Sequence, residues 1–290
     1  MIEIIFQSSA DARNFHKHLH DRLQSSNQTD KKTLQFEDQH IVKIFIDHNQ
    51  KDFESVKEVF CQFIVNRKQD DWFRRILIEN YYYEDEGEQQ QILEIIHSIL
   101  EGNREDLAAF VSGLDVRESL KSAIDQLFQD HISFSFDSFV KFRMRPLMDQ
   151  MAKYVEVSID EYKMEQEYQM FIQTLRDFLS GRQAKLDTIH LLMDEGIAFF
   201  DEQFYEIKRG ELLRMIDRKL LSNHPVYVDS GTIAPLLSIA PACIHLYSDD
   251  YEQPLVRTIR NIFEERLMLH SISAFYENKR TYPYAADEKM

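Results

Sequence analysis

Two histidines near the start of the chain, in the segment HKHLHD, have the spacing of a metal-binding pair. His16 and His20 are four residues apart, which places both imidazoles on one face of a helix. Such a pair binds zinc or nickel when a third ligand joins it. The glutamate of an HExxH motif is absent, and neither cysteine belongs to a Cys/His cluster. We therefore expect a polar helix face and no cofactor, with a metal site at this pair as the alternative.

A second polar group follows an apolar run in YVDSGTIAP. Asp229, Ser230 and Thr232 match the Asp-Ser-Gly-Thr pattern of aspartic proteases, which need a second copy and an all-β frame, whereas the flanking segments look helical. We favour a turn in which Ser230 caps a helix. The enzyme alternative joins these residues to Asp249, after the apolar run 243–247, as a Mg²⁺-dependent phosphate or nucleotide site. The phosphate-loop motifs GxGxxG and GxxxxGK are absent.

Three cations stand two residues apart in the segment HISFSFDSFVKFRMRP, which spans 131–146. We expect the segment to be a joint in the fold, with pairing to acidic helices as one role open to Lys141, Arg143 and Arg145. The alternative is a patch that contacts phosphate or nucleic acid. The spacing of the phenylalanines changes from two to three residues, which is typical of an extended connector entering a helix. Pro146 fits the first turn of the next helix. The phenylalanines are Phe134, Phe136, Phe139 and Phe142.

A run of tyrosines leads into an acidic segment. Between positions 70 and 106 the chain carries eleven acidic residues and three basic ones. Three consecutive aromatic residues cannot all face inward on a helix, so one ring is expected to be exposed or at an interface. The sequence therefore favours a contact surface for a basic partner. The predicted contact residues are Tyr81, Tyr82, Tyr83, Glu84, Asp85 and Glu86, together with Lys141, Arg143 and Arg145.

The elements that would position these groups indicate a predominantly helical α+β protein. An order βαββα is expected over 1–68, with a hairpin whose strands lie at 33–36 and 41–46. A helical region over 69–183 and a C-terminal α/β unit over 184–276 follow, and 277–290 is expected to be a loose tail. Within the C-terminal unit the pattern predicts a hairpin over 188–200, a strand over 243–247 and a final helix over 253–271.

Composition restricts the class of protein. The formal net charge of −16 makes nucleic-acid binding unlikely, because such a surface repels phosphate backbones. Two isolated cysteines are typical of a reduced, intracellular protein. No apolar run is long enough to span a membrane, and the start MIEIIFQSSADA lacks the basic and apolar regions of a signal peptide. The expected location is the cytoplasm.

Three stretches together resemble a known family. They are MIEIIFQSS at the start, the central FDSFVKFRMRPLMDQMAKYVEVSIDEYKMEQEYQMFIQTLRDFL, and TIAPLLSIAPACIHLYS late in the chain. These segments resemble the YtxC family, the sporulation-associated proteins of endospore-forming Bacilli, over residues 1 to about 271. The resemblance implies a cytoplasmic protein of a spore-forming bacterium. It brings no reaction that can be assigned to residues of this chain.

The function predicted from the sequence is that of a non-enzymatic protein-interaction module associated with sporulation. Enzymatic activity is left open, with the phosphate site at Asp229 and Asp249 as one alternative and nucleic-acid binding by the 141–145 segment as another. The partner protein and the oligomeric state do not follow from the sequence.

Overall fold

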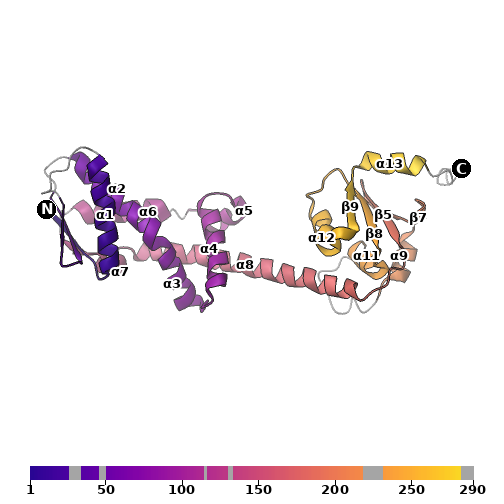
Figure 1. Cartoon of the computed structure of the whole chain (residues 1–290), viewed down its shortest axis with the longest axis horizontal. Coiled ribbons are helices and arrows are strands. Elements are labelled where there is room, and N and C mark those ends of the chain that lie inside the picture. The colour runs from indigo at the N-terminus through magenta and orange to yellow at the C-terminus, as the bar shows by residue number, and fades with distance from the viewer. Residues whose placement is uncertain (26–33, 46–49, 114–115, 130–132, 218–230, 282–290) are drawn as a thin grey trace. The chain divides into compact units, whose positions relative to one another are not determined.

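The computed structural model describes residues 1–25, 34–45, 50–113, 116–129, 133–217 and 231–281. The chain forms two compact units, residues 1–164 and 165–290. Each unit combines helices with a small mixed sheet (Figure 1). The prediction of a predominantly helical α+β protein is therefore confirmed.

The first unit contains a four-stranded sheet in the order β2-β3-β1-β4. The hairpin of β2 (Leu34–Glu37) and β3 (Ile41–Ile44) lies where the sequence places it, and β1 (Ile2–Ile5) pairs with β3 in antiparallel fashion. The βαββ order predicts three strands, but the two-residue strand β4 (Phe134–Ser135) joins β1 in parallel. Such a short strand arrives from far along the chain, so local pattern does not reveal it.

Helices surround this sheet and continue the first unit. A π-helix, η1, connects α2 to α3 and inserts a wider turn into an otherwise α-helical run. The helices are α1 (Ser9–Ser25), α2 (Gln50–Phe63), η1 (Ile64–Lys68), α3 (Gln69–Tyr81), α4 (Glu86–Leu100), α5 (Glu105–Ala108), the 3₁₀-helix η2 (Ala109–Val111), α6 (Val116–Gln129), α7 (Phe136–Phe142) and α8 (Arg145–Ser180).

The phenylalanine-rich connector is part of the core of the first unit. Phe136 stacks on Phe6 with ring centroids 5.2 Å apart, and it meets Phe60 edge-on at 5.9 Å. The backbone leaves strand β4 and enters α7 at once, with the Ser135 hydroxyl accepting the Ser138 N–H at 3.4 Å. The predicted change from extended to helical structure is confirmed, and α8 begins beside Pro146 as expected.

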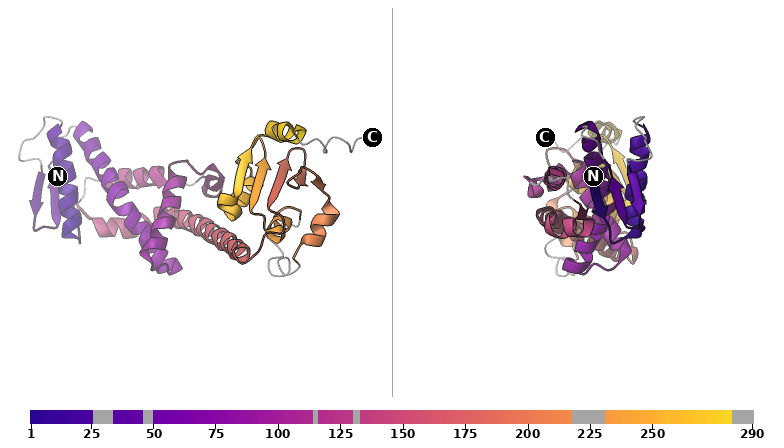
Figure 2. Two further views of the ribbon diagram at one scale, coloured as in Figure 1. Left: turned by 45° about the vertical axis from the view of Figure 1, so that its right-hand side comes forward. Right: turned by 90° about the vertical axis from the view of Figure 1, so that its left-hand side faces the viewer.

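The second unit is built on a five-stranded sheet in the order β7-β6-β5-β8-β9. The three strands β5, β8 and β9 run parallel and lie side by side (Figure 2). The predicted hairpin of β5 and β6 and the predicted strand β8 are confirmed. The strands are β5 (Thr188–Met193), β6 (Ile197–Phe200), β7 (Glu206–Ile207), β8 (Cys243–Tyr247) and β9 (Leu267–His270).

The last segment of the second unit differs from the prediction of one helix over 253–271. Helix α12 ends at Phe263, where Glu264 takes a positive φ of 46°, and the chain then forms strand β9. A further helix, α13, extends four residues into the segment predicted to be a loose tail. The helices of this unit are α9 (Arg209–Met215), α11 (Ile233–Ile239), α12 (Pro254–Phe263), the 3₁₀-helix η3 (Glu264–Arg266) and α13 (Ile272–Arg280).

The two faces of the second sheet pack against different elements. Alternate residues such as Leu191 and Leu246 belong to a core that includes α11, α12 and the end of α8. The opposite face carries His190 and Tyr247 and is covered in part by Phe275 of α13. This second face therefore buries polar rings beneath a short helix.

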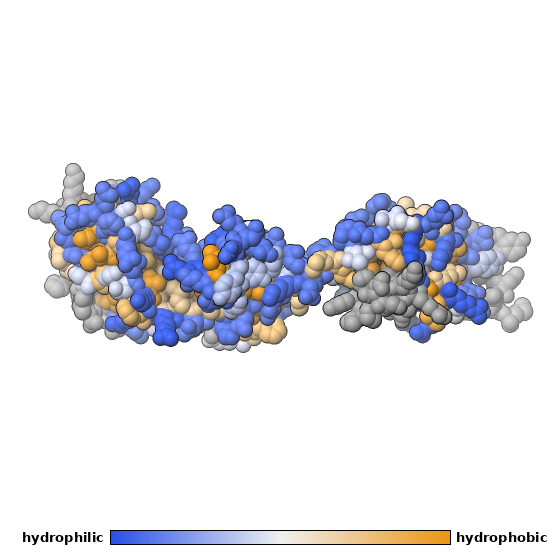
Figure 3. Space-filling view, turned by 90° about the horizontal axis from the view of Figure 1, so that it is seen from below, coloured by the Kyte–Doolittle hydropathy of each residue, from blue (hydrophilic) through white to orange (hydrophobic). Residues whose placement is uncertain are grey.

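The surface mixes hydrophilic and hydrophobic residues. On the face shown in Figure 3, hydrophobic residues lie between hydrophilic ones. Among the helices that the structure describes, none combines the length and the apolar composition needed to cross a lipid bilayer.

Candidate functional site

The three consecutive tyrosines occupy three different environments at the end of α3. Tyr81 is half-buried against the core of the first unit. The Tyr83 ring meets Tyr162 of α8 edge-on, with centroids 6.2 Å apart. Tyr82 between them is 82% exposed. The ring available to a partner is therefore that of Tyr82.

The backbone at Tyr82 explains this exposure. Its φ of 61° and ψ of 28° lie in the left-handed region, which ends α3. The Tyr82 N–H donates to the Ile78 carbonyl at 3.2 Å, and the Tyr83 N–H donates to the Leu77 carbonyl at 3.1 Å. Glycine or asparagine usually occupies such a position, because other L-residues lose about 1 kcal/mol there. An exposed tyrosine is thus an unfavourable choice for folding alone.

The acidic residues that follow have unequal structural roles. Asp85 caps α4, its carboxylate accepting the Glu88 N–H at 2.9 Å. Glu88 in turn accepts the Tyr162 hydroxyl at 3.2 Å. Glu84 and Glu86 are exposed. Two of the four carboxylates therefore stabilise the fold, and Glu84 and Glu86 are available for contact with a partner.

Exposed residues near the tyrosine turn define an acidic–aromatic surface. Burial raises the pKa of Tyr83, and the nearby carboxylates Glu88 and Asp160 raise it further. Asp160, on α8, thus lies close to the tyrosine turn. The acidic–aromatic surface consists of Ile78, Tyr82, Glu84, Glu86 and Asp160.

The three cations of the 141–145 segment do not pair with acidic helices. Lys141, Arg143 and Arg145 are all exposed, and within the described ranges none has a carboxylate within the 4.0 Å of an ion pair. The Lys141 ammonium lies 5.6 Å from the centre of the Phe142 ring. The expected pairing is therefore not seen among the described residues. Phe136 and Phe139 of α7 are buried in the core, whereas Phe142 is 71% exposed beside Lys141.

The cations also separate into two places. Lys141 and Arg145 line a groove of about 680 Å³ together with Arg75 of α3. Arg143 lines a different hollow of about 390 Å³, formed with residues of α6 such as Ser119 and Ser122. We call the first of these the cationic groove; its full lining is Gln7, Asp11, Lys68, Trp72, Arg75, Ile76, Glu79, Asn80, Phe136, Asp137, Val140, Lys141, Arg145 and Met148.

The histidine pair on α1 packs against the first sheet. His16 lies 5.2 Å from the Phe36 ring and 6.1 Å from His20, centroid to centroid. Burial, followed by the repulsion of His20, lowers the pKa of His16. Within the described part of the chain, no group of three or more His, Cys, Asp or Glu is arranged to bind a metal. The pair thus has a packing role against β2.

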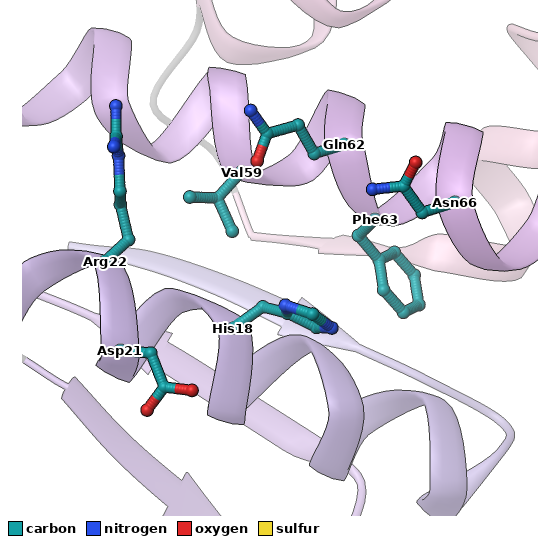
Figure 4. Close-up of a pocket in the computed structure, with 7 residues that line it drawn as sticks. All are labelled: His18, Asp21, Arg22, Val59, Gln62, Phe63 and Asn66. Atoms are coloured by element: carbon teal, nitrogen blue, oxygen red, sulfur yellow. The ribbon is translucent and has the colours of Figure 1, made fainter.

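A small hollow of about 250 Å³ opens between α1 and the α2–η1 segment, and neither histidine of the pair lines it (Figure 4). His18, Asp21 and Arg22 reach it from α1, and Val59, Gln62, Phe63 and Asn66 reach it from α2 and η1. Arg22 also pairs with Glu58 at 3.2 Å, so the two helices are linked at its rim.

The predicted phosphate site in the second unit is only partly visible. Asp229 and Ser230 lie outside the described residues. Thr232 is buried and lines a hollow of about 660 Å³ with Glu206 and Arg209. Asp249 is not among the residues that line this hollow; its carboxylate accepts the Ile272 N–H at 3.1 Å, at the start of α13. Thr232 and Asp249, the two described members of the predicted phosphate site, therefore have different surroundings.

The sequence pattern gave no sign of a row of histidines across the second sheet. His190, His245 and His270 lie on neighbouring strands β5, β8 and β9. The His245 Nδ1 and His270 Nε2 atoms are 3.0 Å apart, and His190 Nδ1 is 2.9 Å from the Tyr247 hydroxyl. The Cys243 thiol is 3.5 Å from His245 Nε2. These side chains form two hydrogen-bonded groups, His190–Tyr247 and Cys243–His245–His270, whose rings stack on one another. We call them together the histidine layer.

Burial favours the neutral forms of two of these histidines, His190 and His245. Burial, and then the proximity of His245 and His270, lowers the pKa of His190 to about 4. Burial also lowers the pKa of His245. The three residues are separated by 55 and 25 positions, so only the register of parallel strands brings them together. A search for short motifs cannot find such a group.

Comparison with known proteins bears on the chain as a whole. The model of the YtxC-like family matches residues 54–268. The chain belongs to the YtxC-like family. A relative from Bacillus subtilis (strain 168), named "Uncharacterized protein YtxC", is 34% identical over 278 residues, covering 95% of this chain and 96% of the relative. The YtxC resemblance identified in the sequence is thereby confirmed.

Structural comparison adds no relative for this YtxC-like chain. No solved structure matches it. The family match includes the tyrosine turn, the 141–145 segment and most of the histidine layer. His270 lies just beyond the matched residues.

Proposed function

We propose that this YtxC-like protein is a non-enzymatic interaction module that binds a basic protein through its acidic–aromatic surface. The observation that carries the proposal is Tyr82, whose ring is 82% exposed on a left-handed backbone. That combination is unfavourable for folding, so contact outside the chain accounts for it best. The neighbouring Ile78 is 44% exposed and extends the apolar part of the surface.

The chemistry of the surface defines the partner. Glu84, Glu86 and Asp160 surround the tyrosine turn with negative charge, which attracts a basic segment and speeds its association. An arginine or lysine that meets the face of the Tyr82 ring gains a cation–π contact. A basic segment with one apolar or aromatic side chain to cover Ile78 fits both parts of the surface.

We place this interaction in the cytoplasm of cells that form spores. The resemblance to sporulation-associated proteins supports the setting, and the free thiols of Cys61 and Cys243 are consistent with a reducing compartment. Replacing the chromosomal gene by a Tyr82→Asn allele tests it: we expect fewer heat-resistant spores and unchanged vegetative growth. Equal spore counts for both alleles would separate the surface from sporulation.

The interaction itself is tested by quantitative affinity capture. Wild-type protein and the Tyr82→Asn variant are compared on lysates of sporulating cells, with Phe110→Asn as the matched control. Phe110 is 76% exposed in the same unit, beyond the opposite end of α4. We expect a protein that is retained by wild type and by Phe110→Asn and lost from Tyr82→Asn. Identical captured sets for all three would eliminate the proposal.

A further inference from the structure

The cationic groove has the composition of a binding site for a negatively charged ligand. Four cationic side chains line it. Lys68 already pairs with Asp11, and the other three come from three helices: Arg75 from α3, Lys141 from α7 and Arg145 from α8. All three are exposed. Its volume of about 680 Å³ lies within the range of small-molecule sites, roughly 300–1,000 Å³.

Most of the acidic groups in the groove already have partners. Asp11 accepts the Lys68 ammonium at 2.7 Å. Asp137 accepts the backbone N–H of Gln7 at 3.0 Å. Glu79 makes no ion pair within the described residues, and neither do the three cations. The hydrogen bond to Gln7 leaves the charge of Asp137 in place, so four cationic and three acidic side chains line the groove. Positive charge is in excess by one here, in a chain whose net charge is −16.

We propose that the cationic groove binds a small phosphate-bearing molecule, its phosphate held by Arg75, Lys141 and Arg145. Two guanidinium groups and an ammonium supply more donors than the carboxylates of Glu79 and Asp137 can accept, and they match the several oxygens of a phosphate. The apolar wall formed by Ile76, Val140 and Met148 can cover the rest of the ligand. A long nucleic acid fits less well, because a chain with a net charge of −16 repels its phosphate backbone.

The chain carries its own reporter for this binding. Trp72, its single tryptophan, lines the groove and is 5% exposed. The probe is inorganic pyrophosphate, which does not absorb where tryptophan emits. We expect the Trp72 emission to change with a Kd below about 1 mM in low salt, and isothermal titration calorimetry to give the same Kd. No binding at about 10 mM pyrophosphate would overturn the proposal.

Variants identify the residues that bind the phosphate. Replacing Arg75, Lys141 and Arg145 together by Gln should weaken pyrophosphate binding roughly tenfold or more. Arg143→Gln is the matched control, because Arg143 lines a different hollow, and its Kd should stay within about twofold. Glu79→Gln should strengthen binding roughly threefold by removing a repelling charge. Equal losses in the triple variant and in Arg143→Gln would refute the assignment.

Two further measurements distinguish the ligand class and the site. A single-stranded oligonucleotide of about 12 nucleotides should bind no more tightly than pyrophosphate and should compete with it. Oligonucleotide binding that pyrophosphate does not displace would contradict a small-ligand site. Tyr82→Asn should leave the pyrophosphate Kd unchanged. The proposal for the cationic groove and the proposal for the acidic–aromatic surface are therefore tested independently. Thermal melting verifies that each variant is folded.

Discussion

The backbone N–H of Tyr82 donates to the carbonyl oxygen of Ile78 at 3.2 Å, while both side chains remain exposed. This hydrogen bond ends α3 and fixes the Tyr82 ring in solvent beside Glu84. The arrangement sets a residue that is unfavourable for folding at the centre of an acidic surface. It is the relationship on which the proposed function depends.

Tyr82→Asn should separate stability from binding. Asparagine tolerates the left-handed backbone, so the free energy of unfolding should stay the same or rise by up to about 1 kcal/mol. Loss of the ring should weaken capture of the partner roughly tenfold. Chemical denaturation measures the first quantity and quantitative capture the second. A variant that unfolds more easily than wild type would show that the ring stabilises the fold.

Glu84→Gln combined with Glu86→Gln should slow association with the basic partner and reduce its salt dependence. The same change should alter the free energy of unfolding by less than about 0.5 kcal/mol, because neither side chain has a structural role. Stopped-flow or surface-binding kinetics at two salt concentrations measure the effect. An unchanged association rate would show that the charges of Glu84 and Glu86 do not attract the partner.

Asp85 must be treated apart from its acidic neighbours. Asp85→Ala should lower the free energy of unfolding by about 1 kcal/mol, since it removes the cap of α4, whereas Asp85→Asn should cost only a few tenths. Thermal and urea denaturation compare the two. Neutralising all of 84–88 at once would mix this folding defect with any loss of binding.

Substitutions in the connector at 131–146 should have large effects on stability at its buried phenylalanine Phe136 and small effects at its exposed cations. Phe136→Ala should lower the free energy of unfolding by about 3–5 kcal/mol, because its ring is buried against Phe6 and Phe60. Replacing Lys141, Arg143 and Arg145 by Gln should change it by less than about 0.5 kcal/mol, since none of them forms an ion pair. Urea denaturation of both variants decides. A large loss in the triple variant would mean that the cations stabilise the fold.

Acid should destabilise the second unit through His190. Its pKa is about 4 in the folded protein and about 6.5 when unfolded. Above pH 6.5 both states are neutral and the stability is complete. Between pH 6.5 and 4 the unfolded state takes up the proton first, so the free energy of unfolding falls, by roughly 3 kcal/mol over the whole interval.

The charged and titratable neighbours of His190 sharpen this test. Its ring stacks on Phe204 and faces Tyr247 and His245, while Asp201 opposes the shift and His270 adds to it. In His190→Gln the decline between pH 6.5 and 4 should be smaller than in wild type, as measured by urea denaturation at several pH values. Parallel curves for both proteins would assign the decline to other groups.

Local pattern predicted the parts of the fold that depend on neighbouring residues. The hairpin over 34–44, the change of period at Phe134–Phe139 and the start of α8 beside Pro146 follow from alternation, turn residues and the geometry of proline. The acidic segment and the tyrosine triplet were visible for the same reason. These features need no knowledge of distant contacts.

The missed features depend on pairing between distant segments. The sequence pattern predicts a helix across strand β9, because Leu267 keeps the apolar spacing of α12. The helix ends instead just before Glu264, whose positive φ no residue pattern indicates. Because strand β9 was not predicted, the sequence could not indicate that His270 lies beside His245 and His190. Likewise, Arg75 joined Lys141 only through the packing of α3 against the connector.

The most direct test of the central claim is photo-crosslinking in sporulating cells from a reactive amino acid placed at position 82, with position 110 as the comparison. Our account predicts a discrete adduct with one protein that carries a basic segment, formed from position 82 and absent from position 110. No adduct from position 82, or the same adducts from both positions, would contradict it.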